Sequence, residues 1–131
     1  MYEHSENTGN RIKILYIDDD ETGCILVREI LCNSDIEVIT AREGNEAVRL
    51  FKSDTSISLV ISDIKLPKMT GFEVLKNIRG IDANIPVIAH SAYLHTGIKE
   101  ECMRSGFNEF IPKPFDVNQF LIIVEKYLNR R

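Results

Sequence analysis

The sequence predicts an α/β domain: a five-stranded, doubly wound parallel sheet with helices on both faces. Three observations lead to this fold class. Short apolar, β-branched segments alternate along the chain with segments of helical periodicity. The 131 residues suit one domain with a single core. Several apolar segments stop abruptly at polar or acidic residues, as buried strands do where they enter loops.

The predicted strands are short and mostly apolar. The first covers residues 12–17 (IKILYI) and stops at the acidic run 18–21 (DDDE). The third, residues 57–62 (ISLVIS), runs into Asp63. Because parallel strands are covered on both faces, they are continuous apolar runs rather than alternating ones. The remaining strands are expected at residues 36–40, 86–91 and 107–112.

Each predicted helix follows a strand and carries apolar residues at helical spacing. The fourth is expected around 95–105, with Gly106 as its carboxyl-terminal cap, and the last over 116–129, with Asp116 as its N-cap. The residues expected to face the sheet are Ile25, Leu26, Ile30 and Leu31; Ala47, Val48 and Phe51; Phe72, Leu75 and Ile78; Ile98, Cys102 and Met103; and Phe120, Ile123, Val124, Tyr127 and Leu128.

Composition and charge limit the function. Apolar residues make up 44% and charged residues 27% of the chain, as in a folded globular protein. A net charge of −4 argues against binding to nucleic acid, which normally needs a basic face. No apolar run approaches the roughly 18 residues of a membrane span, so we expect no membrane segment. Residues 1–10 are polar and are expected to form a flexible tail before a domain over 11–131.

The three cysteines predict no disulfide. Cys24 and Cys32 fall on one predicted helix, eight residues apart. Their Cα atoms would lie about 12 Å apart, beyond the roughly 7 Å that a disulfide tolerates. We expect free thiols, including Cys102, and therefore a cytoplasmic protein.

Acidic residues follow two predicted strands that are commonly neighbours in a doubly wound sheet. Asp18 and Asp19 come after the first strand, and Asp63 comes after the third. In such sheets the working site lies at the carboxyl ends of the strands. Carboxylates that lie so close together repel one another unless a cation neutralises them. A cluster that offers only oxygen ligands suits Mg²⁺. The sequence therefore predicts a magnesium site at this edge.

Two further strand ends supply complementary groups. Ser91 closes the fourth strand with a hydroxyl, and Lys113 follows the fifth with a positive charge. A cation, a lysine, a hydroxyl donor and a nucleophilic carboxylate are the groups that phosphoryl transfer requires. An aspartate can itself accept the phosphoryl group.

Four motifs in order resemble the response-regulator receiver family (CheY-like superfamily). They are Asp18-Asp19 after a strand, Asp63 within SDIKLPKMTG, Ser91-Ala92 after IAH, and Lys113-Pro114 within IPKPF. The match covers residues 11–129, nearly the whole chain. The resemblance implies a flavodoxin-like strand order 2-1-3-4-5.

The resemblance also implies a role for each site residue. Asp63 would be the phosphoacceptor, and Asp18, Asp19 and Asp63, with the backbone carbonyl of Lys65, would hold Mg²⁺ or Mn²⁺. Ser91 and Lys113 would contact oxygens of the phosphoryl group. Phe110 matches the switch aromatic, which moves inward when Ser91 is drawn toward the phosphoryl group. The Lys113–Pro114 bond is expected to be cis.

The implied function is a signalling switch that catalyses only its own phosphorylation and dephosphorylation. The donor would be a sensor histidine kinase or a histidine phosphotransfer protein. With no output domain expected after the last helix, the chain would be a relay intermediate or a diffusible effector; a receiver excised from a hybrid kinase is the alternative. A downstream protein would bind the face formed by residues 95–105, 107–112 and 116–129.

Two functions of other classes remain as alternatives. Residues 18–29 fit the spacing of an EF-hand Ca²⁺ loop, with Gly23 at the sixth position and Glu29 at the twelfth. However, the preceding segment has the pattern of a strand rather than a helix. A phosphohydrolase with an aspartyl nucleophile would carry a further acid two residues on, where this chain has Lys65.

Three more residues near the site carry expectations. Lys65 and Tyr93 lie two residues after Asp63 and Ser91, so their bulky side chains should flank the pocket mouth. We expect them to obstruct the hydrolytic water and prolong the life of the phosphoryl group, which would suit a relay. His90 is expected to be a packed core histidine rather than a ligand.

Overall fold

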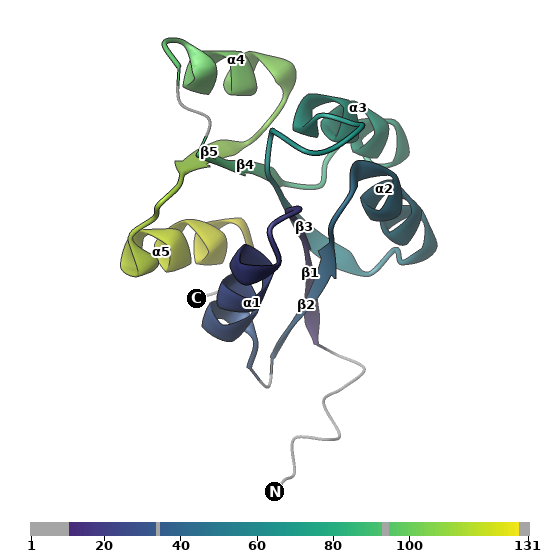
Figure 1. The fold of residues 1–131 in the computed structure, drawn as a ribbon. Helices are drawn as coiled ribbons and strands as arrows, with labels where there is room; N and C mark the ends of the chain where they lie inside the picture. The colour runs from purple at the N-terminus through teal and green to yellow at the C-terminus, as the bar shows by residue number, and fades with distance from the viewer. Residues whose placement is uncertain (1–10, 34, 93–94, 129–131) are drawn as a thin grey trace, which may run out of the picture.

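The computed structural model describes residues 11–33, 35–92 and 95–128. Strands and helices alternate along the whole of this range, as the sequence predicts (Figure 1). In chain order they are β1 (Ile12–Ile17), α1 (Glu21–Leu31), β2 (Ile36–Ala41), α2 (Gly44–Ser53), β3 (Ile57–Ser62), α3 (Gly71–Ile81), β4 (Val87–Ser91), α4 (Ile98–Ser105), β5 (Glu109–Pro112) and α5 (Val117–Leu128).

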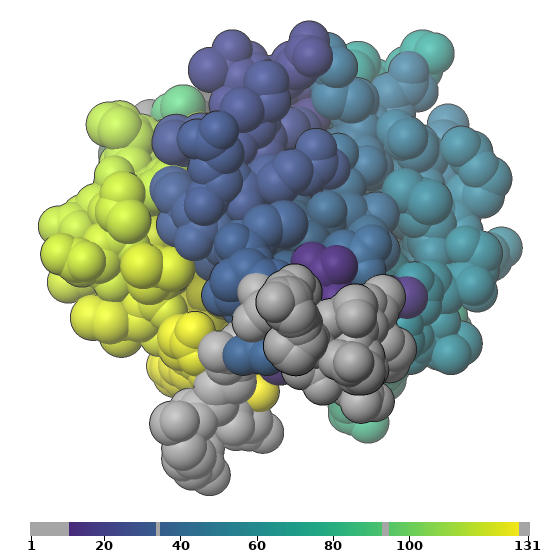
Figure 2. All heavy atoms as spheres, turned by 90° about the horizontal axis from the view of Figure 1, so that it is seen from below, coloured from purple at the N-terminus to yellow at the C-terminus, as the bar shows by residue number. Residues whose placement is uncertain are grey.

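The five strands form one parallel sheet in the order β2-β1-β3-β4-β5, which confirms the expected fold class and strand order. Two apolar clusters pack on its two faces. One cluster holds residues of α2, α3 and α4, and the other holds residues of α1 and α5. Helices α1 and α5 therefore lie together on one face, the relation that Figures 1 and 2 show from two directions.

The structure corrects the predicted inner face of two helices. Helix α1 buries Cys24 and Val27 besides Leu31, whereas Ile25 and Leu26 are about half exposed. In α4, Met103 is likewise exposed. An apolar helix such as α1 offers more than one apolar stripe, and only the stripe turned to the sheet is covered.

Helix ends agree with the expected caps. Gly106 ends α4 with φ of 114°, a left-handed conformation that favours glycine. The Asp116 side chain accepts hydrogen bonds from the backbone N–H groups of Asn118 and Gln119 at the start of α5. Thr70 and Glu73 form a capping box at the start of α3 that we did not predict, although the T-x-x-E spacing indicates one.

The register of β1 and β3 brings their carboxyl ends to the same level. Ile17 is paired with Ser62, so Asp18 and Asp63 leave the sheet side by side. Backbone hydrogen bonds extend this pairing past the strands, from Asp63 N to Ile17 O at 2.9 Å and from Asp18 N to Ala41 O at 3.0 Å. The acidic residues are therefore placed by sheet pairing rather than by a free loop.

Two other expectations can be compared with the described residues. Cys24, Cys32 and Cys102 are free cysteines, as predicted. None of the helices in the described part of the chain is long and apolar enough to span a bilayer.

Candidate functional site

Three carboxylates meet at the carboxyl edge of the sheet. One oxygen from each of Asp18, Asp19 and Asp63 lies within 4.8 Å of the others. Asp18 and Asp63 are buried, while Asp19 is exposed. The structure thus brings together the three acids that the sequence predicts as metal ligands.

Asp18 is fixed by neighbours on β1 and on the loop that follows. Its Oδ2 accepts the Tyr16 hydroxyl hydrogen bond at 3.0 Å, and its Oδ1 accepts the Asp20 N–H at 3.0 Å. Burial and the adjacent Asp18 charge raise the pKa of Tyr16 above its ordinary value. Tyr16 therefore stays a hydrogen-bond donor, and Asp18 is held as an acceptor.

Lys113 bridges two of the carboxylates. Its Nζ lies 2.6 Å from Asp18 Oδ2 and 3.0 Å from Asp63 Oδ2. Burial alone would lower the pKa of this ammonium group, but hydrogen bonds and charge from the two aspartates outweigh it and raise the pKa. Lys113 is held in place through its backbone as well, because its N–H donates to Ser91 O at 3.0 Å.

Asp63 is presented by a tight turn against α3. Its Oδ1 accepts the Ile64 N–H at 2.7 Å, and the Lys65 N–H lies 3.3 Å away. Gly71 packs directly under this turn: a Cβ there would lie 2.8 Å from Ile64 Cα and would collide with the Asp63 carbonyl oxygen. Glycine is needed here for close approach, a role that the sequence alone did not reveal.

The other predicted site residues lie around this centre. Ser91 ends β4 and is buried, and Phe110 in β5 packs within the apolar cluster of α2, α3 and α4. Lys65 is exposed beside Asp63, and the Lys113–Pro114 peptide bond is cis. Tyr93 lies outside the described residues.

The donor set fits a divalent hard cation. All three groups offer oxygen, and three carboxylates against the one Lys113 ammonium leave a formal charge of −2. Mg²⁺ prefers carboxylate oxygens and keeps several waters, so it suits a cluster at a partly open edge. The exposed Asp19 beside the buried Asp18 and Asp63 matches such a site.

The EF-hand interpretation of residues 18–29 is wrong. That loop needs a sharp turn at its sixth position, whereas α1 begins at Glu21, the fourth position, and already includes Gly23. Asp20 caps this helix by accepting the Thr22 N–H. The Asp20 side chain is therefore the N-cap of α1.

Comparison with known proteins gives one consistent family. The profile of the response regulator receiver domain matches residues 14–125. The chain is 34% identical over 118 residues to the chemotaxis protein CheY of Bacillus subtilis, covering 89% of this chain and 98% of that protein. It is also 34% identical over 116 residues to sporulation initiation phosphotransferase F of the same organism, covering 88% and 93%.

Solved structures of receiver domains superpose well on this chain. A chain of the CheX–CheY–BeF3–Mg²⁺ complex from Borrelia burgdorferi superposes with a TM-score of 0.83 at 32% identity, covering 92% of each chain. A response regulator receiver domain protein from Clostridium thermocellum superposes with a TM-score of 0.83 at 30% identity, covering 90% of this chain and 94% of that one. Some relatives are longer: the chain spans 25% of the regulatory protein AtoC of Escherichia coli.

Proposed function

Since the chain belongs to the response regulator receiver domain family of two-component signalling, we propose that it is a phosphoryl-accepting switch with Asp63 as the acceptor. The observation that carries this proposal is the acidic centre itself. Asp18 and Asp63 come from neighbouring strands, and Lys113, far along the chain, contacts both. A purely structural ion pair would not need a lysine shared by two buried carboxylates, with a third, exposed carboxylate within 4.8 Å of them.

Asp18, Asp19 and Asp63 would hold Mg²⁺, with the backbone carbonyl of Lys65 as a further ligand. The bound ion would supply charge neutralisation for the phosphoryl oxygens. Tyr16 and the Asp20 N–H orient Asp18, and the Ile64 N–H orients Asp63, so the carboxylates are positioned before a donor arrives. This preorganisation is what phosphoryl transfer needs, because there is little covalent assistance to give.

The transfer forms one bond to phosphorus and breaks another. A carboxylate oxygen of Asp63 forms a bond to phosphorus while the bond from phosphorus to the donor's imidazole nitrogen breaks. The electron pair of the broken bond stays on that nitrogen, and the leaving group is a neutral imidazole because the other ring nitrogen of the donor carries a proton. The Lys113 ammonium then pairs with a phosphoryl oxygen, because the negative charge that it contacts on Asp63 has moved outward onto that group.

We propose that Ser91 and Phe110 carry the signal from the site to a surface. Ser91 ends β4 next to Lys113, and Phe110 in β5 is buried beside the same strand, paired with Ala89. A hydroxyl drawn toward a phosphoryl group would change the space available to this aromatic ring. A downstream protein would then recognise the face of α4, β5 and α5.

The phosphoryl donor would be a histidine kinase or a histidine phosphotransfer protein, and the chain would act as a relay intermediate or a diffusible effector. The two roles differ in where the phosphoryl group goes. A relay intermediate returns it to a histidine of a second phosphotransfer protein, whereas an effector keeps it while bound to a target. The two roles can be distinguished by mixing the protein, phosphorylated with a labelled phosphoryl group, with a phosphotransfer protein and measuring which of the two proteins carries the label.

Acetyl phosphate with Mg²⁺, followed by intact mass spectrometry, tests the acceptor. We expect one added phosphoryl group, which is absent when Mg²⁺ is omitted from the reaction and absent in Asp63→Asn. Asp82→Asn is the matched control, because Asp82 is an exposed aspartate at the end of α3. Phosphorylation of Asp63→Asn at the wild-type level would overturn the assignment.

A further inference from the structure

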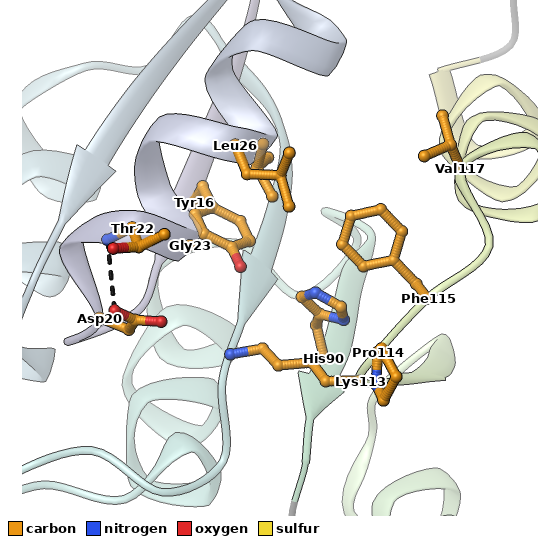
Figure 3. A pocket seen from close by; sticks show the side chains of 11 residues that line it. Tyr16, Asp20, Thr22, Gly23, Leu26, His90, Lys113, Pro114, Phe115 and Val117 are labelled. Carbon is orange, nitrogen blue, oxygen red and sulfur yellow. Dashed lines mark hydrogen bonds between the residues drawn. The ribbon is translucent and has the colours of Figure 1, made fainter.

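A hollow adjoins the acidic site, and Lys113 forms part of its wall. It lies between α1 and the start of α5 and has a volume of about 280 Å³ (Figure 3). Its walls are mainly apolar and aromatic, and Lys113 is the only lysine or arginine among the described residues that line it. The residues used below are Tyr16, Leu26, His90, Phe115 and Val117.

Three aromatic rings stand around this hollow. The His90 ring lies 5.2 Å from the Phe115 ring and 6.0 Å from the Tyr16 ring, measured between centroids. Figure 3 shows the His90 ring between these two side chains, facing the space that they enclose. Such separations and tilts are typical of favourable aromatic packing, so the wall offers surfaces that suit an aromatic ligand.

His90 contributes an unpaired polar atom to this wall. The residue is 1% exposed, and its Nδ1 lies 3.0 Å from the carbonyl oxygen of Ile111. A carbonyl only accepts hydrogen bonds, so Nδ1 carries the hydrogen and Nε2 of the neutral ring is an acceptor. Within the described residues no atom donates to Nε2, which is itself buried.

A buried acceptor without a donor is uncommon in native proteins and calls for an explanation. Burial lowers the pKa of His90 to about 4, so the ring stays neutral near pH 7 and Nε2 keeps its lone pair. The expectation of a packed core histidine is confirmed for the burial of the ring. It does not account for the unpaired Nε2, which is covered within the wall of the hollow that His90 helps to line.

We propose that this hollow binds a small neutral aromatic molecule that carries one hydrogen-bond donor, with its ring between Phe115 and Tyr16, whose side chains move apart so that the ligand's O–H or N–H reaches the buried His90 Nε2. A simple inorganic anion offers no donor to Nε2. An organic cation would meet both the Lys113 ammonium and the Asp20 carboxylate on this wall, so charge does not favour it over a neutral ligand. The volume limits the ligand to one ring or two fused rings. This site is independent of phosphorylation, although Lys113 joins it to the acidic centre.

The test is a titration of the unphosphorylated ¹⁵N-labelled protein, followed by nuclear magnetic resonance. Phenol and indole are the probes, and toluene is the matched control because it has the shape of phenol without a donor. We expect saturable shifts of Tyr16, His90 and Phe115 signals, with toluene weaker than phenol by about tenfold or more. The imidazole spectrum of His90 should show an unprotonated Nε2 whose signal moves when phenol binds.

Two variants separate the donor contact from the apolar hollow. His90→Phe keeps a ring but removes the acceptor, so phenol should bind no better than toluene. Val117→Phe, at a partly exposed position on the rim, should weaken the binding of phenol and of toluene alike. This variant tests the hollow if His90→Phe does not fold.

Four results would overturn the proposal. They are equal affinity for phenol and toluene in the wild type, shifts that grow linearly without saturation, a protonated Nε2, and a crystal structure in which a water on Nε2 stays in place with phenol present. Each of these four results can be measured on the unphosphorylated protein, whether or not Asp63 accepts a phosphoryl group.

Discussion

Exchange of Gly71 for alanine tests how α3 positions Asp63. The new methyl group would lie 2.8 Å from Ile64 Cα and 3.1 Å from the Asp63 carbonyl carbon, and still closer to that carbonyl's oxygen. These are backbone atoms, so a side-chain rotation cannot relieve the overlap. Either α3 moves away from the turn or the turn that carries Asp63 shifts.

The size of the effect follows from two opposing contributions. Forcing a methyl group into a filled space costs about 1–3 kcal/mol. Alanine recovers about 0.5–1 kcal/mol relative to glycine within a helix. We therefore expect Gly71→Ala to lower the free energy of unfolding by about 1–2 kcal/mol.

Gly80→Ala is the matched control in the same helix. A Cβ at Gly80 meets nothing within 4 Å, so only the helix preference acts there. Urea denaturation should show Gly80→Ala more stable than the wild type by about 0.5–1 kcal/mol. The two variants should therefore move stability in opposite directions.

The same exchange should affect the chemistry. We expect the turn to share in the displacement, so the Asp63 carboxylate moves relative to Asp18 and phosphorylation by acetyl phosphate should slow by roughly tenfold in Gly71→Ala. Gly80→Ala should be phosphorylated at the wild-type rate. A Gly71→Ala protein with wild-type stability and wild-type phosphorylation would refute this account of the turn.

Three further perturbations test the site and its surroundings. Lys113→Met leaves Asp18 and Asp63 without their shared cation and should lower the free energy of unfolding by about 1–3 kcal/mol without Mg²⁺; Mg²⁺ should restore part of it, and a variant as stable as the wild type in chelator would contradict the bridging role. Between roughly pH 7 and pH 5 the wild type should lose about 2 kcal/mol because unfolded His90 takes up a proton near its ordinary pKa of 6.5, while folded His90, with a pKa of about 4, stays neutral. The stability that neutral His90 contributes is fully present above about pH 6.5 and decreases as the pH is lowered toward 4. Urea denaturation of His90→Phe at both pH values should not show this loss. An equal loss in the variant would exclude His90 as its source. Lys65→Asn should shorten the life of the phosphoryl group severalfold by opening the approach of water, with Lys68→Asn in the same loop as control; equal decay rates would remove Lys65 from this role.

Sequence patterns determined the order of elements and the edge on which the chemistry lies. The apolar runs 12–17 and 57–62 specify buried strands, and a parallel sheet sends all its carboxyl ends to one edge. The positions of Asp18, Asp63 and Lys113 just after three strands were therefore readable from local periodicity. These features depend on neighbours a few residues away, which is why a single sequence contains them.

Contacts between distant residues were decided only by the tertiary structure. Periodicity left two apolar stripes on α1, and packing against the sheet chose Cys24 and Val27 over Ile25 and Leu26. The close approach of Gly71 to Asp63 and the unpaired nitrogen of His90 also carry no local signal. The physical reason is that sterics and hydrogen-bond partners are set by the atoms that folding brings together, and these atoms belong to residues farther apart in the sequence than one turn of helix or one strand pair.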